Sequence, residues 1–301
     1  WGPRPIDFHL KAFKELGATV ELNSGYIVTK GSLASATIIF PKPSVGATGN
    51  VIMACVNLNK EVIIKNASME PEIVDLCHFL TKVGVSFKGV GTDTLTIHGS
   101  NQKSDINLTY SIIPDRIEAG TFMIACAATG GKITLNNVNP NHLTSVINAL
   151  IKANTKITKN QTTLTVESDG ITNPFNIITD VYPGFPTDLQ AQWIALMCKS
   201  KGKSTVVDNI YLDRFTHVPE LNRLGANITM NKNIASIEGV NTLYAANVMS
   251  TDIRASASLI IAAMCSIDET KLSRIYHIDR GYENIEAKLT NLNANIKRVN
   301  S

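Results

Sequence analysis

The sequence predicts an α/β protein of two domains, each built from a repeated unit of helices and strands. Helical and strand-like patterns alternate along the chain, and one such pattern recurs at intervals of about 70 residues. The length of 301 residues suits two domains better than one. A polar stretch, GSNQKSDINLTYS, precedes residues 112–114 and favours domains over 1–113 and 114–301. A single stacked solenoid is the alternative architecture.

Four segments share the repeated pattern. They start at Ser44, Arg116, Pro186 and Asp252. Each opens with an amphipathic helix that carries small residues and Cys or Met, as in SVGATGNVIMAC. A short β-branched strand follows, then a second helix and another strand, and three of the four segments add one more alternating strand. This order predicts a unit in which helices connect the strands of one sheet.

The two ends of the chain hold incomplete units. RPIDFHLKAFKELGATVELNSGYIVT matches the second half of a unit, and the last unit lacks its final strand. We therefore expect a further region of at least half a unit upstream of Trp1. A natural protein with degenerate end repeats is the alternative.

Composition and motifs exclude several classes of protein. The net charge of +3, without a basic stripe, argues against a nucleic-acid partner, and no apolar run approaches the roughly 20 residues of a membrane span. Dinucleotide, phosphate-loop, nucleophile-elbow and metal-ligand signatures do not occur, so the chain looks like neither a nucleotide hydrolase nor a dehydrogenase. The five cysteines lie in apolar stretches, which predicts reduced core residues and a cytoplasmic protein. They are Cys55, Cys77, Cys126, Cys198 and Cys265.

Helix starts carry the residues of greatest interest. Ser44 is a predicted N-cap, and Asp115 with Glu118 has the spacing of a capping box. Asp188 and Asp252 fall at the starts of two further helices. If the units pack with pseudo-symmetry, several helix N-termini converge on one cleft, where free N–H groups favour anions. The simpler interpretation is that each residue only caps its helix.

Five arginines lie at or beside predicted helix starts, although a cation is unfavourable at the positive end of a helix. A bound anion or a neighbouring carboxylate would explain the pattern, and arginine suits bidentate contact with carboxylate or phosphate. The pattern therefore favours a multiply anionic ligand over simple pairing with the adjacent aspartates. The sequence contexts GPRP, PDRIE, LDRF, TDIRAS and HIDRG hold Arg4, Arg116, Arg214, Arg254 and Arg280.

Five strings together resemble the bacterial UDP-N-acetylglucosamine 1-carboxyvinyltransferase family of enolpyruvyl transferases. They are PDRIEAGTF, GFPTDLQAQ, DRFTHVPEL, TDIRASASL and HIDRGYENIEAKL, and the resemblance runs over essentially the whole chain. The EPSP synthases share the fold but not these strings, and are a distant alternative. The resemblance implies two similar domains of pseudo-threefold βαβαββ units, known as inside-out α/β barrels, with the substrates between them.

The resemblance also implies the reaction. The enolpyruvyl group of phosphoenolpyruvate passes to the 3-hydroxyl of UDP-N-acetylglucosamine, and phosphate leaves from a tetrahedral intermediate. This step begins peptidoglycan synthesis in the bacterial cytoplasm and uses no cofactor. The candidate catalytic residues that follow from it are Asp188, Asp252, Arg280 and Arg4.

The same resemblance assigns binding roles. Arg4 would face phosphoenolpyruvate, and the arginines of the second domain would hold anionic oxygens. Asp188 would take the proton of the sugar hydroxyl, and Ile210 would touch the nucleotide sugar. Residues 4–8 would line the uridine end, and Lys42 with Ser44, Val45 and Gly46 would hold the diphosphate region. The full set of substrate-binding candidates is Arg4, Pro5, Ile6, Asp7, Phe8, Lys42, Ser44, Val45, Gly46, Asp188, Ile210, Arg214, Arg254 and Arg280.

The sequence departs from the family at its front. The family carries a Cys on a loop just before the Gly-x-Arg-Pro motif, and that position would precede Trp1. We expect the first quarter of the enzyme, including a strand of the second domain, to be missing, and the chain alone to be inactive unless that segment is supplied as a separate chain. Two other hypotheses are a fragment or relative that only binds UDP-sugar and a structural protein that keeps the fold.

Overall fold

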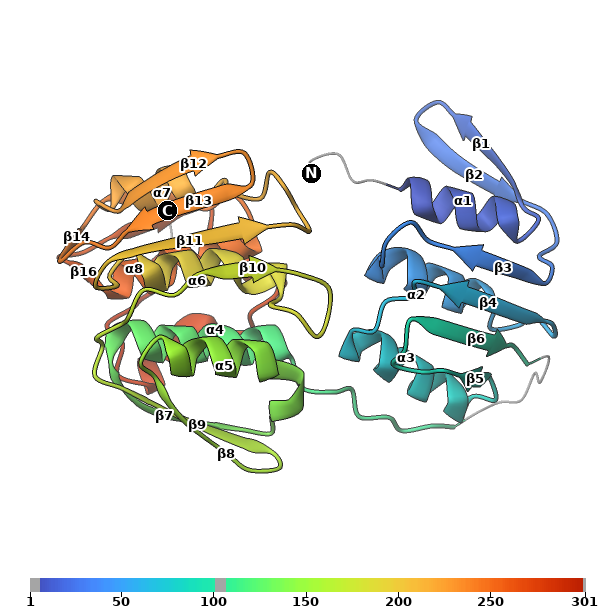
Figure 1. Ribbon diagram of the computed structural model, residues 1–301, viewed down its shortest axis with the longest axis horizontal. Coiled ribbons are helices and arrows are strands. Elements are labelled where there is room, and N and C mark those ends of the chain that lie inside the picture. The colour runs from blue at the N-terminus through green and yellow to red at the C-terminus, as the bar shows by residue number, and fades with distance from the viewer. Residues whose placement is uncertain (1–5, 101–106, 300–301) are drawn as a thin grey trace. The chain divides into compact units, whose positions relative to one another are not determined.

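The computed structural model describes residues 6–100 and 107–299. The chain divides into two compact units, Trp1–Ile113 and Pro114–Ser301. Figure 1 labels the helices and strands of both units. No helix within the described residues is long and apolar enough to cross a membrane.

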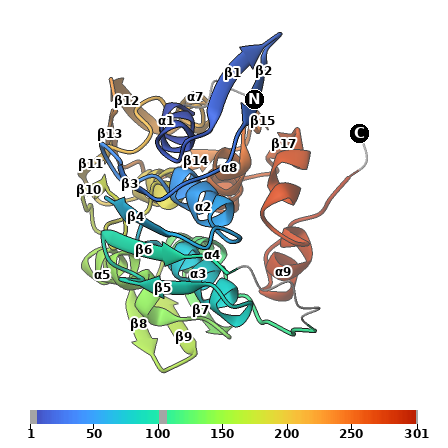
Figure 2. The same cartoon turned by 90° about the vertical axis from the view of Figure 1, so that its right-hand side faces the viewer.

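The first unit contains one hairpin and one four-stranded sheet. The chain runs α1 (Asp7–Glu15), β1 (Thr19–Asn23), β2 (Tyr26–Lys30), β3 (Ala36–Ile39), α2 (Val45–Ala54), β4 (Glu61–Lys65), α3 (Pro71–Lys82), β5 (Ser86–Lys88) and β6 (Thr94–His98). The sheet order is β3-β4-β6-β5, and the separate hairpin β1-β2 extends beyond α1 (Figure 2). Helices α1 and α3 both pack on α2, whose inner face is buried in the core of this unit.

The second unit contains three sets of strands around its helices. Its first half is α4 (Arg116–Thr129), β7 (Gly131–Asn136), η1 (Pro140–Leu143), α5 (Thr144–Lys152), β8 (Lys156–Lys159), β9 (Thr163–Ser168), β10 (Ile177–Thr179), η2 (Thr187–Leu189), α6 (Gln190–Met197) and β11 (Lys203–Asp208). Its second half is α7 (Val218–Arg223), β12 (Asn227–Asn231), β13 (Ile234–Glu238), β14 (Leu243–Tyr244), β15 (Asn247–Met249), α8 (Ile253–Met264), β16 (Ser266–Ile267), β17 (Lys271–Ser273), η3 (Ile275–Arg280) and α9 (Ile285–Asn291). The sheets are β7-β9-β8, β10-β11-β13-β12 and the short pairs β14-β16 and β15-β17.

The predicted repeat is confirmed by two sheets with the same topology. The segments β3–α2–β4–α3–β5–β6 and β10–α6–β11–α7–β12–β13 place their strands in the same order. In each sheet the first pair is parallel and the other two pairs are antiparallel. The parallel pair requires a crossover, which α2 or α6 supplies, and the last two strands form an antiparallel hairpin. Both therefore have the βαβαββ order.

The second unit has its most buried helices at the centre. Helices α4, α6 and α8 pack against one another, and the strands lie outside them. All eight residues of α6 are buried, as are most of α4 and α8. Because these helices are enclosed on all sides, they carry small and apolar residues around their whole circumference rather than on one stripe. This is the inside-out arrangement that the family resemblance implied.

The cysteines have the predicted state. All five are free thiols, four of them buried and Cys265 partly exposed. Burial raises the pKa of Cys55 to about 11 and that of Cys77 to about 12, so both stay protonated at neutral pH.

Two glycines mark the same position in the two matching sheets. Gly99 follows β6, and a Cβ there would lie 2.1 Å from the carbonyl oxygen of Cys55. Gly239 follows β13, and a Cβ there would lie 1.8 Å from the carbonyl oxygen of Ser200. Each repeat therefore needs a residue without a side chain where its last strand passes the end of its first helix.

Substituting either glycine by alanine should destabilise the protein. We expect Gly99→Ala and Gly239→Ala each to lower the free energy of unfolding by about 1–3 kcal/mol, because the obstructing atoms belong to the backbone. Urea unfolding followed by circular dichroism measures the change. Gly49→Ala is the control, since its Cβ would meet Ile73 at an ordinary 3.6 Å. Equal stability of all three variants would contradict the prediction.

Candidate active site

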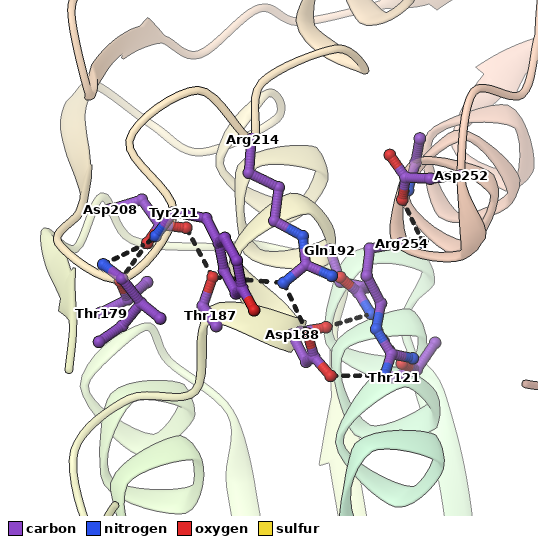
Figure 3. A network of polar contacts seen from close by, with 12 residues as sticks. Thr121, Thr179, Thr187, Asp188, Gln192, Asp208, Tyr211, Arg214, Asp252 and Arg254 are labelled. Atoms are coloured by element: carbon purple, nitrogen blue, oxygen red, sulfur yellow. Dashed lines mark hydrogen bonds and ion pairs between the residues drawn. The ribbon is translucent and has the colours of Figure 1, made fainter. Parts of the chain in front are cut away.

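A cluster of charged side chains in the second unit surrounds Asp188 (Figure 3). Arg214 Nη1 donates to Asp188 Oδ1 at 2.6 Å, and Arg254 Nη2 donates to Asp188 Oδ2 at 2.6 Å. The carboxylate is thus held by one arginine on each oxygen. The side chains of Asp188, Arg214 and Arg254 are 35%, 26% and 17% exposed, so the cluster is partly open to solvent.

Three helix starts bring this cluster together. Asp188 lies in η2, the short 3₁₀ turn that leads into α6. Arg254 lies in the first turn of α8, and Arg214 lies in the loop between β11 and α7. A cation near the start of a helix is electrostatically unfavourable. For Arg214 and Arg254 the carboxylate of Asp188, which is remote from both in sequence, compensates the positive charge.

The two arginines decide the ionisation of Asp188. Burial alone would raise the pKa of this carboxyl, but the charges of Arg254 and Arg214 and their hydrogen bonds lower it from 3.8 to about 2. Burial alone would lower the pKa of Arg254, whereas Asp188 and Tyr282 raise it above its ordinary value. At neutral pH the cluster is therefore a carboxylate between two guanidinium cations.

Acid should remove the stability that this cluster provides. Because the folded pKa of Asp188 is depressed, its contribution is complete above pH about 4 and is lost as pH falls toward about 2. We expect the difference in unfolding free energy between the wild type and Asp188→Asn to shrink over this range in urea titrations at each pH. A difference that stays constant between pH 4 and pH 2 would contradict the assignment.

Asp252 caps α8 beside this cluster. Its Oδ1 accepts from the backbone N–H groups of Arg254 (2.7 Å) and Ala255 (3.0 Å), and its Oδ2 accepts from Thr216 Oγ1 (3.2 Å). Burial would raise the pKa of Asp252, but these backbone hydrogen bonds, together with the charge of Arg214, lower it. Nearby His217 is buried, and burial lowers its pKa to about 4, so it is neutral at pH 7.

The other predicted caps are also formed. Ser44 Oγ accepts from the backbone N–H of Ala47 at the start of α2. Asp115 Oδ1 accepts from two backbone N–H groups at the start of α4, whereas the carboxylate of Glu118 accepts from Lys288 Nζ at 2.7 Å.

A buried hydroxyl network supports the arginine of α8. Tyr282 is 1% exposed, and its hydroxyl lies 2.8 Å from Thr121 Oγ1 on α4. Gln192 Nε2 on α6 donates to both hydroxyl oxygens and to the carbonyl oxygen of Asp188. Arg254 Nη1 donates to the Tyr282 hydroxyl at 3.5 Å. One tyrosine hydroxyl thus joins the three central helices next to the charged cluster.

Two further candidates of the second unit lie at the end of η3 and after β11. Arg280 is exposed at the end of η3 and lines an open depression with Glu118, Tyr282 and Lys288. Ile210 follows β11, and its backbone N–H donates to Asp208 Oδ1 at 2.9 Å.

The candidates of the first unit gather at two adjacent helix starts. Ile6, Asp7 and Phe8 begin α1, and Phe8 stacks on Phe40 with ring centroids 6.0 Å apart. Lys42, Val45 and Gly46 are exposed around the start of α2, next to the capping residue Ser44. The ring of His9 lies against Gly46 and bonds Asn50 Nδ2, so the two helix starts meet. Arg4 and Pro5 lie outside the described residues.

The sequence analysis missed several residues of the site. Gln192, Thr187 and Tyr282 contact Asp188, Arg214 and Arg254 in turn. Thr121 contacts Tyr282, and Asp208 contacts Thr187. All except Asp208 lie in the strings that carry the family resemblance, but they were assigned no role there. His9 and His217 were also missed. A polar residue within an otherwise apolar helix was the available signal for Thr121 and Gln192. In the described part of the chain, no three His, Cys, Asp or Glu side chains gather in a way that could hold a metal ion.

Solved structures with this architecture are enolpyruvyl transferases. The enolpyruvyl transferase NikO from Streptomyces tendae superposes with a TM-score of 0.89 at 21% identity, over 98% of this chain and 72% of that one. An EPSP synthase from Acinetobacter baumannii gives a TM-score of 0.70 at 16% identity, over 99% and 72%. The fold is thus that of the enolpyruvyl transferases.

Sequence comparisons define the family more closely. The family described as EPSP synthase (3-phosphoshikimate 1-carboxyvinyltransferase) matches residues 1–289. The UDP-N-acetylglucosamine 1-carboxyvinyltransferase of Chlorobium phaeovibrioides is 47% identical over 301 residues, which are 99% of this chain and 70% of that protein. The protein of the same name from Campylobacter hominis is 47% identical over 298 residues, or 99% and 71%. The chain therefore belongs to the EPSP synthase family of carboxyvinyltransferases.

Proposed function

We propose that the protein transfers the enolpyruvyl group of phosphoenolpyruvate to the 3-hydroxyl of UDP-N-acetylglucosamine and releases phosphate. The observation that carries the proposal is the carboxylate of Asp188 held between Arg214 and Arg254. The relatives named UDP-N-acetylglucosamine 1-carboxyvinyltransferase, 47% identical over nearly the whole chain, support this choice of substrates.

The charges of the cluster suit this reaction. Phosphoenolpyruvate and the diphosphate are multiply anionic, and arginines with helix N-termini provide donors for such oxygens. Asp188 is ionised at neutral pH and can therefore accept a proton, but a pKa of about 2 makes it a weak base. When substrate oxygens take over part of the hydrogen bonding of Arg214 and Arg254, the pKa of Asp188 rises and the carboxylate becomes a better base.

The steps balance as an addition followed by an elimination. The 3-hydroxyl oxygen bonds to C2 of phosphoenolpyruvate and its proton goes to Asp188, while C3 takes a proton from solvent to become a methyl group and returns one to solvent in the elimination. The resulting tetrahedral intermediate then loses a C3 proton while the bond between C2 and the phosphate oxygen breaks. Arg254 and Arg280 hold the anionic oxygens, and positioning contributes as much as basicity. Asp252 keeps the first turn of α8, and with it Arg254, in place.

The product would be an enolpyruvyl nucleotide sugar, the first committed precursor of peptidoglycan in the bacterial cytoplasm. The substrates are the two partners that this proposal requires, and the family chemistry uses no cofactor.

Binding and turnover should be measured separately on the same preparation. Calorimetry measures binding of UDP-N-acetylglucosamine, and phosphate release from phosphoenolpyruvate measures turnover. We expect release with UDP-N-acetylglucosamine and none with shikimate 3-phosphate when the chain is assayed together with the upstream segment that the family resemblance implies. Binding without release would favour the hypothesis of a protein that only binds UDP-sugar, and release with shikimate 3-phosphate alone would overturn the proposal.

A further inference from the structure

Asp208 is a fully buried carboxylate at the end of β11. Its Oδ1 accepts from Thr179 Oγ1 (2.7 Å) and from the backbone N–H groups of Ile210 and Tyr211 (both 2.9 Å). Its Oδ2 accepts from Thr187 Oγ1 (2.7 Å). All four donors are neutral, so the charge is stabilised by short hydrogen bonds alone. Such a group is costly to bury unless every bond is made, which requires a fixed arrangement of the donors.

The backbone of Asp208 is held by Asn233, in the turn between β12 and β13. Its N–H donates to the carbonyl oxygen of Asn233 at 3.0 Å, and its carbonyl oxygen accepts from Asn233 Nδ2 at 3.0 Å. Thr179 is the register partner of Asp208 in the parallel pair β10-β11. The carboxylate therefore projects from a rigid point of the sheet, at the carboxyl ends of two parallel strands, where α/β sheets commonly bind ligands.

Three of the four donors belong to the segments that form the candidate site, and the fourth, Thr179, lies in β10. Thr187 immediately precedes Asp188, and its Oγ1 also accepts from Arg214 Nη1 at 3.4 Å. The backbone groups of Ile210 and Tyr211 belong to the loop that carries Arg214. Figure 3 shows Asp208, Thr187, Arg214 and Asp188 in one connected chain of contacts. Asp208 thus joins the turn that carries Asp188 to the loop that carries Arg214.

We propose that Asp208 is a positioning residue for the nucleotide sugar. It fixes the turn with Asp188 and the loop with Ile210 at a set separation without touching the substrate. This inference rests on the proposed function, because it assigns the loop and the turn to the sugar nucleotide. Arg254, which lies on α8 and has no hydrogen bond to Asp208 among the described contacts, keeps its place when Asp208 changes.

The test is the variant Asp208→Asn, which keeps the shape of the side chain and removes its charge. The dissociation constants for UDP-N-acetylglucosamine and for phosphoenolpyruvate are measured by calorimetry, and KM and kcat by phosphate release. We expect the dissociation constant and KM for UDP-N-acetylglucosamine to rise about tenfold, the cost of impairing hydrogen bonds to a charged group. The constants for phosphoenolpyruvate should change less than about twofold.

Further variants separate positioning from general stability. Thr187→Val removes one donor to Asp208 and one weak acceptor for Arg214 Nη1. It should raise the UDP-N-acetylglucosamine constant by a smaller factor, and it is the test if Asp208→Asn does not fold. Asp75→Asn is the matched control, because Asp75 is 9% exposed, accepts from the Tyr110 hydroxyl at 2.7 Å and lies in the first unit. It should leave both constants unchanged.

Two outcomes overturn the inference and can be told apart. If the wild type binds UDP-N-acetylglucosamine and the variant binds equally well, or loses both ligands equally, then Asp208 has no positioning role. If the wild type binds phosphoenolpyruvate but not UDP-N-acetylglucosamine, the proposed function itself fails and the inference fails with it.

Discussion

Asp188→Asn should reduce turnover on the order of 10²- to 10⁴-fold, because the amide cannot accept the hydroxyl proton. The substitution keeps the size of the side chain but leaves Arg214 and Arg254 facing a neutral group. Phosphate release under steady-state conditions measures the loss. Binding of UDP-N-acetylglucosamine should weaken far less than turnover, since the change affects a proton transfer rather than the whole contact surface.

Asp169→Asn is the matched control for this variant. Asp169 is an exposed aspartate of the same unit whose Oδ1 accepts only a local backbone hydrogen bond, from Ile171 at 2.9 Å. It should keep wild-type turnover. If Asp188→Asn retained more than about one tenth of wild-type turnover, Asp188 would not be the base.

Arg254→Met should cause the second large loss. Methionine keeps much of the apolar stem, but Asp188 loses one of its two cationic partners and Tyr282 loses a donor. Removing one partner of a partly buried charge pair costs about 2–5 kcal/mol, which corresponds to a loss of at least about 30-fold in kcat/KM. The pKa of Asp188 should rise at the same time, because the charge of Arg254 is the main influence that lowers it.

Arg223→Met controls for the loss of an arginine as such. Arg223 is 55% exposed and pairs with Glu220 at 3.3 Å on the surface of α7. Exposed pairs contribute little, so we expect turnover to remain unchanged. Equal effects of Arg254→Met and Arg223→Met on kcat/KM would show that Arg254 is not part of the site.

The sequence predicted those parts of the molecule that depend on local patterns. The four predicted starts coincide with the N-cap Ser44, the first helical residue Arg116, the cap Pro186 of η2 and the N-cap Asp252. The periodicity of the helices and strands gave the recurring order of helix, strand, helix and strand, because period and β-branching are properties of each segment alone. The complete βαβαββ unit was implied by the family resemblance. The candidates Asp188, Arg214 and Arg254 came from the anomaly of charges at helix starts, and the structure brings these three together.

The rest of the site depends on contacts between distant segments. Thr121 and Tyr282 are 161 positions apart, and Asp208 is 21 positions from Thr187. Nothing near Asp208 in the sequence indicates that its carboxylate is buried, because that follows from the register of β10 and β11. Pairing between specific arginines and Asp188 could not be predicted either, since any of several carboxylates was available at the helix starts. Register and side-chain pairing are tertiary properties, and a single sequence does not display them.

The enclosed central helices have a consequence for how the chain reaches its native state. Helix α6 is buried along its whole length, so it gains little by forming before its neighbours are present. Its partners α4 and α8 come from opposite ends of the second unit, which makes the decisive contacts non-local. Such topologies fold slowly, and until the helices assemble they expose apolar surface to other chains. The enclosure that makes the native unit compact therefore makes nascent and partly unfolded molecules prone to aggregate.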